Sequence, residues 1–284
     1  EKMIRGIAIQ KFTDRDKQEV RGYFELLQNV FDAYEDIRFS ENSVKHLHKE
    51  LLKFIDKDKR HRGEYKKTEN AVQMVDASGK IAGTVFETTP AYLTPKETQE
   101  LVEWTGAALS DHKFHSLLVI GNFLVEFLKI HPFQDGNGRL SRILTNLLML
   151  KEGYLYMPYV SHEKLIESKK TEYYLALRKS QRTFKKNAAE DIVPWLDFFL
   201  DVVYEQSKMA VGLLSQEGIE QVLSNKQLAV WEYLERVEEA TAGTISKMSK
   251  VARPTVNQAL EKLLRMGRIQ RLGLGRSTRY RKLK

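Results

Sequence analysis

Apolar residues recur three and four positions apart through most of this chain, and that spacing limits what it can fold into. Two stretches show it most clearly, at Val20, Phe24, Leu27 and Phe31 and at Leu117, Ile120, Phe123, Leu124 and Leu128. Side chains spaced in this way share one face of a helix that packs on a core. The pattern predicts further helices at residues 43–56, 95–109, 139–152, 164–183 and 190–209, so the fold is expected to be mainly α.

One segment departs from the helical spacing. Residues 71–75 and 81–86 are short runs rich in β-branched and other apolar residues, and residues 76–79 between them contain a glycine. Two such runs around a glycine-containing turn predict a β-hairpin. Because an isolated hairpin is marginally stable in water, we expect this one to pack on the helices.

Positive charge is concentrated at the C-terminal end. The chain of 284 residues has a formal net charge of +8, whereas residues 226–284 hold 14 Lys and Arg against 5 Asp and Glu, a net +9 that leaves −1 for the rest. A nearly neutral body with a basic appendage indicates a module that meets a polyanion. We expect two domains, residues 1–215 and 216–284, because Gly212 and Gly218 interrupt the helical pattern near the point where the charge balance changes.

The sequence argues against several classes of protein. Its longest apolar stretch, residues 116–130, is interrupted by Asn122, Glu126 and Lys129, and a membrane span needs roughly 18 unbroken apolar residues. No membrane helix is therefore expected. The chain has no Cys, which excludes disulfides and thiolate metal sites, and residues 1–5 lack the apolar core of a secretory signal. A cytoplasmic location is the expectation.

A loop after the second apolar stretch carries groups suited to binding an anion. It contains His131, Asp135 and the triplet Gly136, Asn137 and Gly138. Glycines on both sides of Asn137 allow backbone N–H groups to converge on one point, and the next helix, starting near residue 139, adds unpaired donors and the positive end of its dipole. The loop is expected to hold phosphate.

Charged side chains around the loop extend this expectation to a polyphosphate. Arg139 and Arg142 are three residues apart, so both guanidinium groups can reach one side and bind phosphate oxygens. Asp135 is suited to holding Mg²⁺ together with those oxygens. His131, whose unperturbed pKa would be about 6.5, can accept a proton from an incoming hydroxyl. Taken singly, each residue also has a purely structural explanation, and Phe133 is expected to be a packing anchor.

Together the loop residues resemble the signature of the Fic family, His-x-Phe-x-(Asp or Glu)-Gly-Asn-Gly-Arg-x-x-Arg. Every defined position is matched, by His131, Phe133, Asp135, Gly136, Asn137, Gly138, Arg139 and Arg142. The resemblance extends to the hairpin upstream and to residues 173–177 downstream, and it covers residues 15–209. It implies a Fic helical core with a short β-hairpin flap.

The resemblance implies a protein adenylyltransferase that transfers AMP from ATP to a Tyr, Thr or Ser hydroxyl of a protein substrate. His131 would be the general base, and Asp135 would bind Mg²⁺. The phosphates would be held by the loop amides and both arginines, at Gly136, Asn137, Gly138, Arg139 and Arg142. Tyr174 and Leu177 resemble positions that flank the adenine, although ordinary core packing explains them equally well.

Two further features of the family bear on regulation and substrate docking. The hairpin resembles the family's flap, whose open edge can pair with an extended target segment; a purely structural hairpin is the alternative. Many members carry an inhibitory helix, Ser or Thr-x-x-x-Glu-(Gly or Asn), whose glutamate pairs with the second motif arginine. Here only Ser168 and Glu172 have that spacing, and Tyr173 stands where Gly or Asn belongs. Such a segment could precede Glu1, belong to a partner, or be absent.

His46 and His48 are two residues apart in a predicted helix. That spacing directs their side chains to different sides of the helix, so no metal site is expected there.

The basic C-terminal segment resembles a winged helix-turn-helix. The spacing predicts a helix containing Leu228, Trp231, Tyr233 and Leu234, a short helix at 244–249, a third helix introduced by Pro254, and a hairpin at 269–281. In the third helix the expected inward side is Val256, Leu260, Leu263 and Leu264, and the expected outward side is Arg253, Thr255, Asn257, Gln258 and Lys262.

In that fold the third helix enters the major groove of DNA, and the wing, here Arg276, Arg279 and Arg281, contacts phosphates. DNA is therefore the expected partner of this segment, with protein contact or formation of a homodimer as the alternative. For the whole chain two functions stay open. One is the adenylyltransferase; the other is a DNA-binding regulator whose Fic domain senses a nucleotide or modifies only itself. UTP or GTP could replace ATP, because the loop recognises phosphates.

Overall fold

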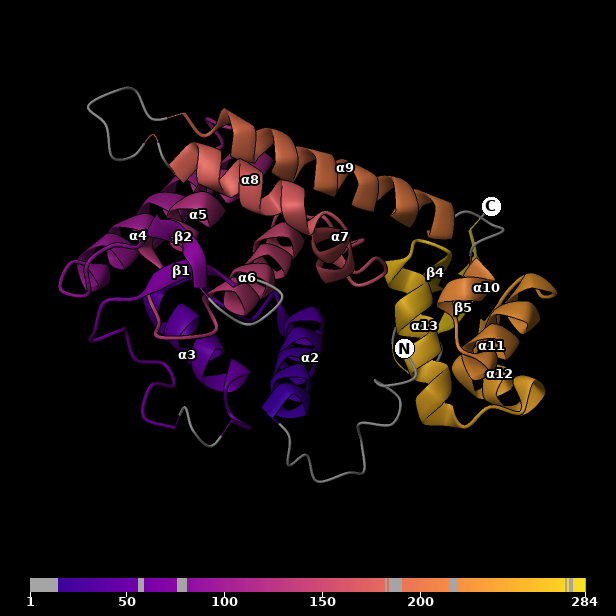
Figure 1. The fold of residues 1–284 in the computed structure, drawn as a ribbon. Coiled ribbons are helices and arrows are strands. Elements are labelled where there is room, and N and C mark those ends of the chain that lie inside the picture. The colour runs from indigo at the N-terminus through magenta and orange to yellow at the C-terminus, as the bar shows by residue number, and fades with distance from the viewer. Residues whose placement is uncertain are drawn as a thin grey trace. The chain divides into compact units, whose positions relative to one another are not determined.

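The computed structural model describes residues 15–55, 59–75, 81–181, 183, 191–214, 219–273, 275 and 278–283 (Figure 1). The chain divides into two compact units, Glu1–Gln206 and Ser207–Lys284. Each unit has a hydrophobic core of its own. The predicted domain boundary between residues 215 and 216 lies outside the described residues and stays a prediction.

Helices dominate the described part of the first unit, which confirms the mainly α fold. In chain order they are α2 (Arg15–Ala33), α3 (Glu41–Leu51), α4 (Thr94–Asp111), α5 (Ser116–Ile130), α6 (Asn137–Lys151), α7 (His162–Ser168), α8 (Lys170–Gln181) and α9 (Val193–Leu214), of which α9 continues past Gln206 into the second unit. The prediction of one helix over 164–183 is wrong: Lys169, with φ −112° and ψ 28°, leaves the helical conformation and separates α7 from α8. No Gly or Pro marks this break.

Helices α5 and α6 form the centre of the first unit. Helix α5 packs on α4, α6 and α8, and α6 also packs on α2 and α3. The fully buried side chains of this core include Phe123, Phe127, Leu144, Leu147 and Leu148. The loop that joins α5 to α6 is therefore fixed at both ends by the most deeply packed helices of the unit.

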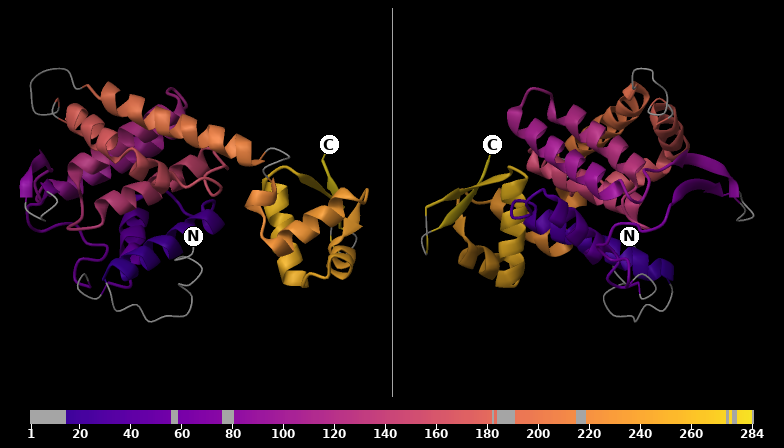
Figure 2. Two further views of the ribbon diagram at one scale, coloured as in Figure 1. Left: turned by 45° about the vertical axis from the view of Figure 1, so that its right-hand side comes forward. Right: turned by 90° about the vertical axis from the view of Figure 1, so that its left-hand side faces the viewer.

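Strands β1 (Ala71–Val75) and β2 (Ile81–Glu87) form the predicted hairpin, which projects from the helices in Figure 2. They pair antiparallel, with Ala71 opposite Glu87, and the register shifts twice along β1. Such irregularities twist and bend a strand pair. The predicted turn at residues 76–79 lies outside the described residues.

The second unit has the predicted winged-helix fold. Its elements are α10 (Ile219–Val222), α11 (Asn225–Glu235), β3 (Ala240–Thr241), α12 (Ala242–Ser249), α13 (Arg253–Arg265), β4 (Ile269–Leu272) and β5 (Arg279–Lys282). The three strands pair antiparallel in the order β3, β5, β4. Strand β3 was not predicted, because two residues are too few to show an alternating pattern.

Most side chains of helix α13 lie on the buried or the exposed side that the spacing predicts. Val256, Leu260 and Leu263 are buried in the second core. Arg253, Asn257 and Gln258 are exposed, whereas Leu264 and Thr255 are half-buried. The predicted outward position of Lys262 is wrong, because its ammonium group folds back and donates to the carbonyl of Val222 at 2.7 Å.

Two further observations complete the fold. In the predicted wing, Arg276 lies outside the described residues, and Arg279 Nη1 pairs with Glu239 Oε1 at 2.6 Å. None of the described helices is both long enough and apolar enough to cross a membrane.

Candidate active site

His131 follows the last residue of α5 and ends that helix. Its backbone is left-handed, with φ 52° and ψ 59°, and its N–H donates to the carbonyl of Phe127 at 2.9 Å. The ring folds back on its own helix, where Nδ1 lies 3.1 Å from the carbonyl oxygen of Leu128. Because a carbonyl only accepts, Nδ1 carries the proton, and in the neutral ring Nε2 holds the lone pair.

The surroundings of His131 keep its ring neutral. The pKa of His131 is lowered to about 4, chiefly by burial and to a smaller extent by the nearby Lys66, while the bond to Leu128 and the charge of Asp135 act against the shift. At neutral pH the side chain therefore exists almost entirely in the form that accepts a proton.

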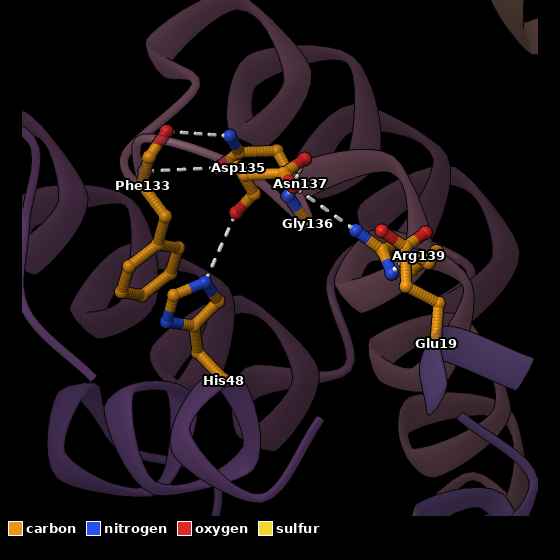
Figure 3. A network of polar contacts seen from close by, with 7 residues as sticks. All are labelled: Glu19, His48, Phe133, Asp135, Gly136, Asn137 and Arg139. Carbon is orange, nitrogen blue, oxygen red and sulfur yellow. Dashed lines mark hydrogen bonds and ion pairs between the residues drawn. The ribbon is translucent and has the colours of Figure 1, made fainter. Parts of the chain in front are cut away.

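The side chain of Asn137 closes the loop that follows. Asn137 Oδ1 accepts from the N–H of Phe133 at 2.9 Å, and Asn137 Nδ2 donates to the carbonyl of Phe133 at 2.7 Å (Figure 3). Both residues are buried, with 1% of Asn137 and none of Phe133 exposed. Because the side chain of Asn137 is bonded inside the loop, only its backbone N–H is available for the predicted contact with an anion. Phe133 is the packing anchor that was expected.

His48 of α3 contacts the loop and holds it in place, a structural role that was not predicted from the sequence. Its ring stacks on Phe133 with centroids 3.8 Å apart, its Nε2 lies 3.0 Å from the carbonyl of Asp135, and the N–H of Gly63 donates to its Nδ1 at 3.0 Å. Burial lowers the pKa of His48 to about 4, which fits a neutral ring that donates through Nε2. The sequence does indicate that His48 is buried, because His48 continues the apolar face of Val44 and Leu47.

Gly136 lets the chain turn from the loop into α6. Its φ of 79° is left-handed, and a Cβ there would lie 3.4 Å from Leu51 and 3.5 Å from His48. The first bond of the helical ladder runs from the N–H of Leu140 to the carbonyl of Gly136 at 2.8 Å. The N–H groups of residues 137–139 precede that ladder, and α6 has no side-chain cap. Together with the dipole they make this helix start a suitable anion site.

The carboxylate of Asp135 lies at the edge of the same loop. Its Oδ1 accepts from the N–H of Gly136 at 2.6 Å, and its side chain is 44% exposed. Within the described residues no group of three or more His, Asp or Glu side chains is arranged around one point. A single accessible carboxylate fits Mg²⁺, which commonly takes one protein ligand together with substrate phosphates and waters.

Both motif arginines lie at the helix start, and each is paired with a carboxylate from another helix. Arg139 Nη1 is 2.8 Å from Glu19 of α2, and its Nη2 is 3.4 Å from Asp135. Arg142 Nε donates to Glu163 of α7 at 2.6 Å. Glu19 and Glu163 were not predicted, because nothing in the sequence says which carboxylates the fold brings to these arginines. A phosphate would share or replace these partners.

Tyr174 and Leu177, the predicted neighbours of the adenine, occupy different environments on α8. Tyr174 is 41% exposed, whereas Leu177 is 2% exposed and belongs to the main core. The two residues are three apart on α8, which makes them neighbours on the helix surface, and their contact with a base stays a prediction.

Comparison with known proteins finds family matches for both parts of the chain. Residues 38–149 match the model of the Fic/DOC family, and residues 223–284 match that of the sugar-specific transcriptional regulator TrmB. The chain is 32% identical over 88 residues to a probable protein adenylyltransferase of Aquifex aeolicus, covering 31% of this chain and 27% of that protein. It is 29% identical over 133 residues to protein adenylyltransferase Fic of Drosophila virilis, covering 45% of this chain and 26% of that protein.

The chain thus spans about a quarter of the length of these two relatives. Among solved structures, a Fic family protein from Desulfovibrio desulfuricans covers 99% of this chain with a TM-score of 0.59 at 21% identity, and 79% of that protein is covered. At this identity the likeness concerns the fold. From the loop, the folds and these matches, the chain carries a Fic/DOC-family domain over residues 38–149 and a TrmB-type winged helix over residues 223–284.

Proposed function

We propose that this protein transfers AMP from ATP to a hydroxyl side chain of a protein. One observation carries the proposal. His131, with its proton on Nδ1 and a pKa lowered to about 4 chiefly by burial, is joined by residues 132–136 to a helix start that offers backbone amides and two arginines. A neutral base next to an anion site is what transfer of a phosphoryl-linked group to an alcohol requires.

In the proposed reaction the hydroxyl oxygen attacks the α-phosphorus of ATP while His131 Nε2 takes the hydroxyl proton. The bond from the α-phosphorus to the bridging oxygen breaks, and pyrophosphate leaves with that oxygen. The amides of residues 137–139 and the guanidinium groups of Arg139 and Arg142 neutralise charge on the phosphates. The protein forms no covalent intermediate, so the rate depends on positioning and on electrostatic stabilisation.

Asp135 would hold Mg²⁺ through its exposed carboxylate. The ion would offset phosphate charge, as it does in other phosphoryl-transfer sites. The acceptor residue, Tyr, Thr or Ser, and the choice of ATP over UTP or GTP belong to the proposal as its finer parts, since the loop contacts phosphates and not the base.

The test is incubation of the protein with labelled ATP, Mg²⁺ and a cell lysate, followed by mass spectrometry of the labelled products. We expect label on proteins other than the chain itself and its loss with His131→Ala. Label confined to the chain would favour a regulator that modifies only itself. No label in any product, with UTP and GTP also inactive, would refute the proposal.

We infer a second function, DNA binding, for the winged helix. A polar groove of about 420 Å³ lies between α12, α13 and the wing, and its lining includes Arg253, Asn257 and Arg271. Exposed cations beside an amide that can read adenine suit a DNA contact. We expect binding to duplex DNA that weakens steeply with added salt. Arg253→Ala should flatten that salt dependence, and absence of binding at low salt would favour a protein partner.

A further inference from the structure

Lys66 is buried at the junction of the hairpin and the catalytic loop. Only 4% of its surface is exposed, and its ammonium group lies 2.9 Å from Asn70 Oδ1, 3.0 Å from Thr88 Oγ1 and 3.0 Å from the carbonyl of Ile130. An ammonium has three protons to donate, and these three acceptors match them in number. A lysine so deeply buried is unusual unless its head group is fully hydrogen-bonded.

The three acceptors belong to the two ends of the hairpin and to the end of α5. Asn70 immediately precedes β1, Thr88 immediately follows β2, and Ile130 is the last residue of α5, directly before His131. One ammonium group therefore joins both ends of the hairpin to the residue next to the general base.

Backbone and amide contacts reinforce the same junction. The N–H of Lys66 donates to the carbonyl of Pro132 at 2.9 Å, and Asn70 Nδ2 donates to the carbonyl of Phe133 at 2.9 Å. The Thr88 hydroxyl lies 2.7 Å from both oxygens of Asn70. Lys66 and Asn70 thus contact the carbonyls on either side of His131, and Thr88 bonds to both of these residues.

We propose that Lys66 is a positioning residue for the transfer, because its ammonium group fixes both ends of the hairpin against the end of α5 and so sets where an incoming hydroxyl meets His131. This inference rests on the proposed function and on the flap role that the resemblance implies for the hairpin, whose open edge would pair with the target segment. Displacements of about 1 Å in such a site are enough to slow a reaction on the order of 100-fold.

The charges around the junction give a measurement that does not depend on turnover. Lys66 and Asp135 are the charged groups that act on His131, and Glu69 and Glu97 are those that act on Lys66. The cation of Lys66 lowers the pKa of His131, so its removal should raise that pKa. The titration of His131, followed by NMR in nucleotide-free protein, therefore reports whether the ammonium occupies this position.

The decisive variant is Lys66→Met, which keeps the aliphatic stem and removes the charge. We expect the transfer rate to a protein substrate to fall about 10- to 100-fold, while the Kd for ATP stays within about 2-fold and the pKa of His131 rises. Lys66→Arg should bring the pKa of His131 back towards the wild-type value. Lys67→Met, at the exposed neighbour, is the matched control and should leave all three quantities unchanged.

Transfer and His131 titration in Lys66→Met equal to those of Lys67→Met would overturn the inference. Should Lys66→Met fail to fold, Thr88→Val removes one acceptor of the ammonium group together with the hydroxyl contact to Asn70, and an unchanged transfer rate in that variant overturns the inference equally. Should the wild-type protein transfer no nucleotide, the proposed function fails. The inference about the junction is then decided by the His131 titration together with hydrogen exchange of the β1 amides, which should accelerate in Lys66→Met and not in Lys67→Met.

Discussion

The two sides of the catalytic loop are held in different ways. On the inner side, Phe133 and Asn137 are buried and bond to each other, and Phe133 stacks on His48. On the outer side, Asp135 and Arg139 are partly exposed and are held by ion pairs, as Arg142 is by Glu163. A buried hydrogen bond on the inner side has no replacement once its partner is lost, whereas phosphate or a cation can replace the ion-pair partners on the outer side. The loop thereby separates the residues that stabilise it from those that we propose to perform chemistry.

Asp135→Asn should give the largest effect and tests whether the outer side carries chemistry without stability. Asparagine keeps an oxygen for the N–H of Gly136 but loses the charge needed for Mg²⁺. We expect transfer to fall on the order of 100-fold or more, since metal stabilisation is worth several kcal/mol. The free energy of unfolding in urea should change by less than about 1 kcal/mol. The control is Asp197→Asn on the exposed face of α9; equal activity in both variants would contradict the assignment.

Asn137→Ala tests the inner side. It leaves the N–H of buried Phe133 unpaired, which costs about 1–3 kcal/mol, and it removes one of the two donors to the Phe133 carbonyl, which keeps its bond from Asn70 Nδ2. We expect the free energy of unfolding to drop by about 2–4 kcal/mol, measured by urea denaturation. Asn146→Ala, which removes a single bond to the carbonyl of Arg142, should cost less. A cost for Asn137→Ala no larger than that of the control would break the distinction between the two sides.

Lowering the pH should reduce the stability of the protein through its buried histidines, one of which, His48, packs on the inner side of the loop. Burial lowers the pKa values of His48, His131 and His162 to about 4 in the folded protein. The unfolded chain takes up these protons below about pH 6.5, so stability is full above that pH and falls as the pH drops towards 4. Each histidine contributes up to about 1.4 kcal/mol per pH unit in this window.

His48→Gln should therefore reduce the slope of stability against pH between 6.5 and 4 by about 1 kcal/mol per pH unit. Chemical denaturation at several pH values measures it, with the exposed His46→Gln as the matched control. A slope identical in both variants would show that the ring of His48 is not held neutral.

Glu19→Gln should give the smallest effect and sharpens the view of the outer side as exchangeable. The change weakens the partner of Arg139 Nη1, now 2.8 Å away, and leaves the guanidinium more available to phosphate. An ion pair of this kind is worth up to about 1 kcal/mol, so ATP affinity should rise about 2- to 5-fold. Calorimetry measures the Kd, with Glu25→Gln on the same helix as control. Weaker binding would mean that Glu19 orients the arginine for phosphate.

The sequence predicted those features that depend on local spacing. The helices, the hairpin and the winged helix follow from apolar periodicity and turn residues, and the signature placed the loop between α5 and α6. The partners that hold the loop come from elements far away in sequence, such as His48, Lys66, Glu19 and Glu163. Such long-range contacts leave no local pattern: the apolar face of α3 indicates that His48 is buried but not what its ring contacts, and Lys66 reads as an ordinary surface residue until the fold is known.

The left-handed backbone of His131 sets stability against activity at one position. With φ at 52°, the residue occupies a conformation that glycine adopts freely and that other residues adopt at about 1–2 kcal/mol. Variants chosen only for resistance to heat should accumulate glycine there and thereby discard the imidazole. A thermostabilised form of this protein obtained by such selection would be the wrong starting point for any study of its chemistry.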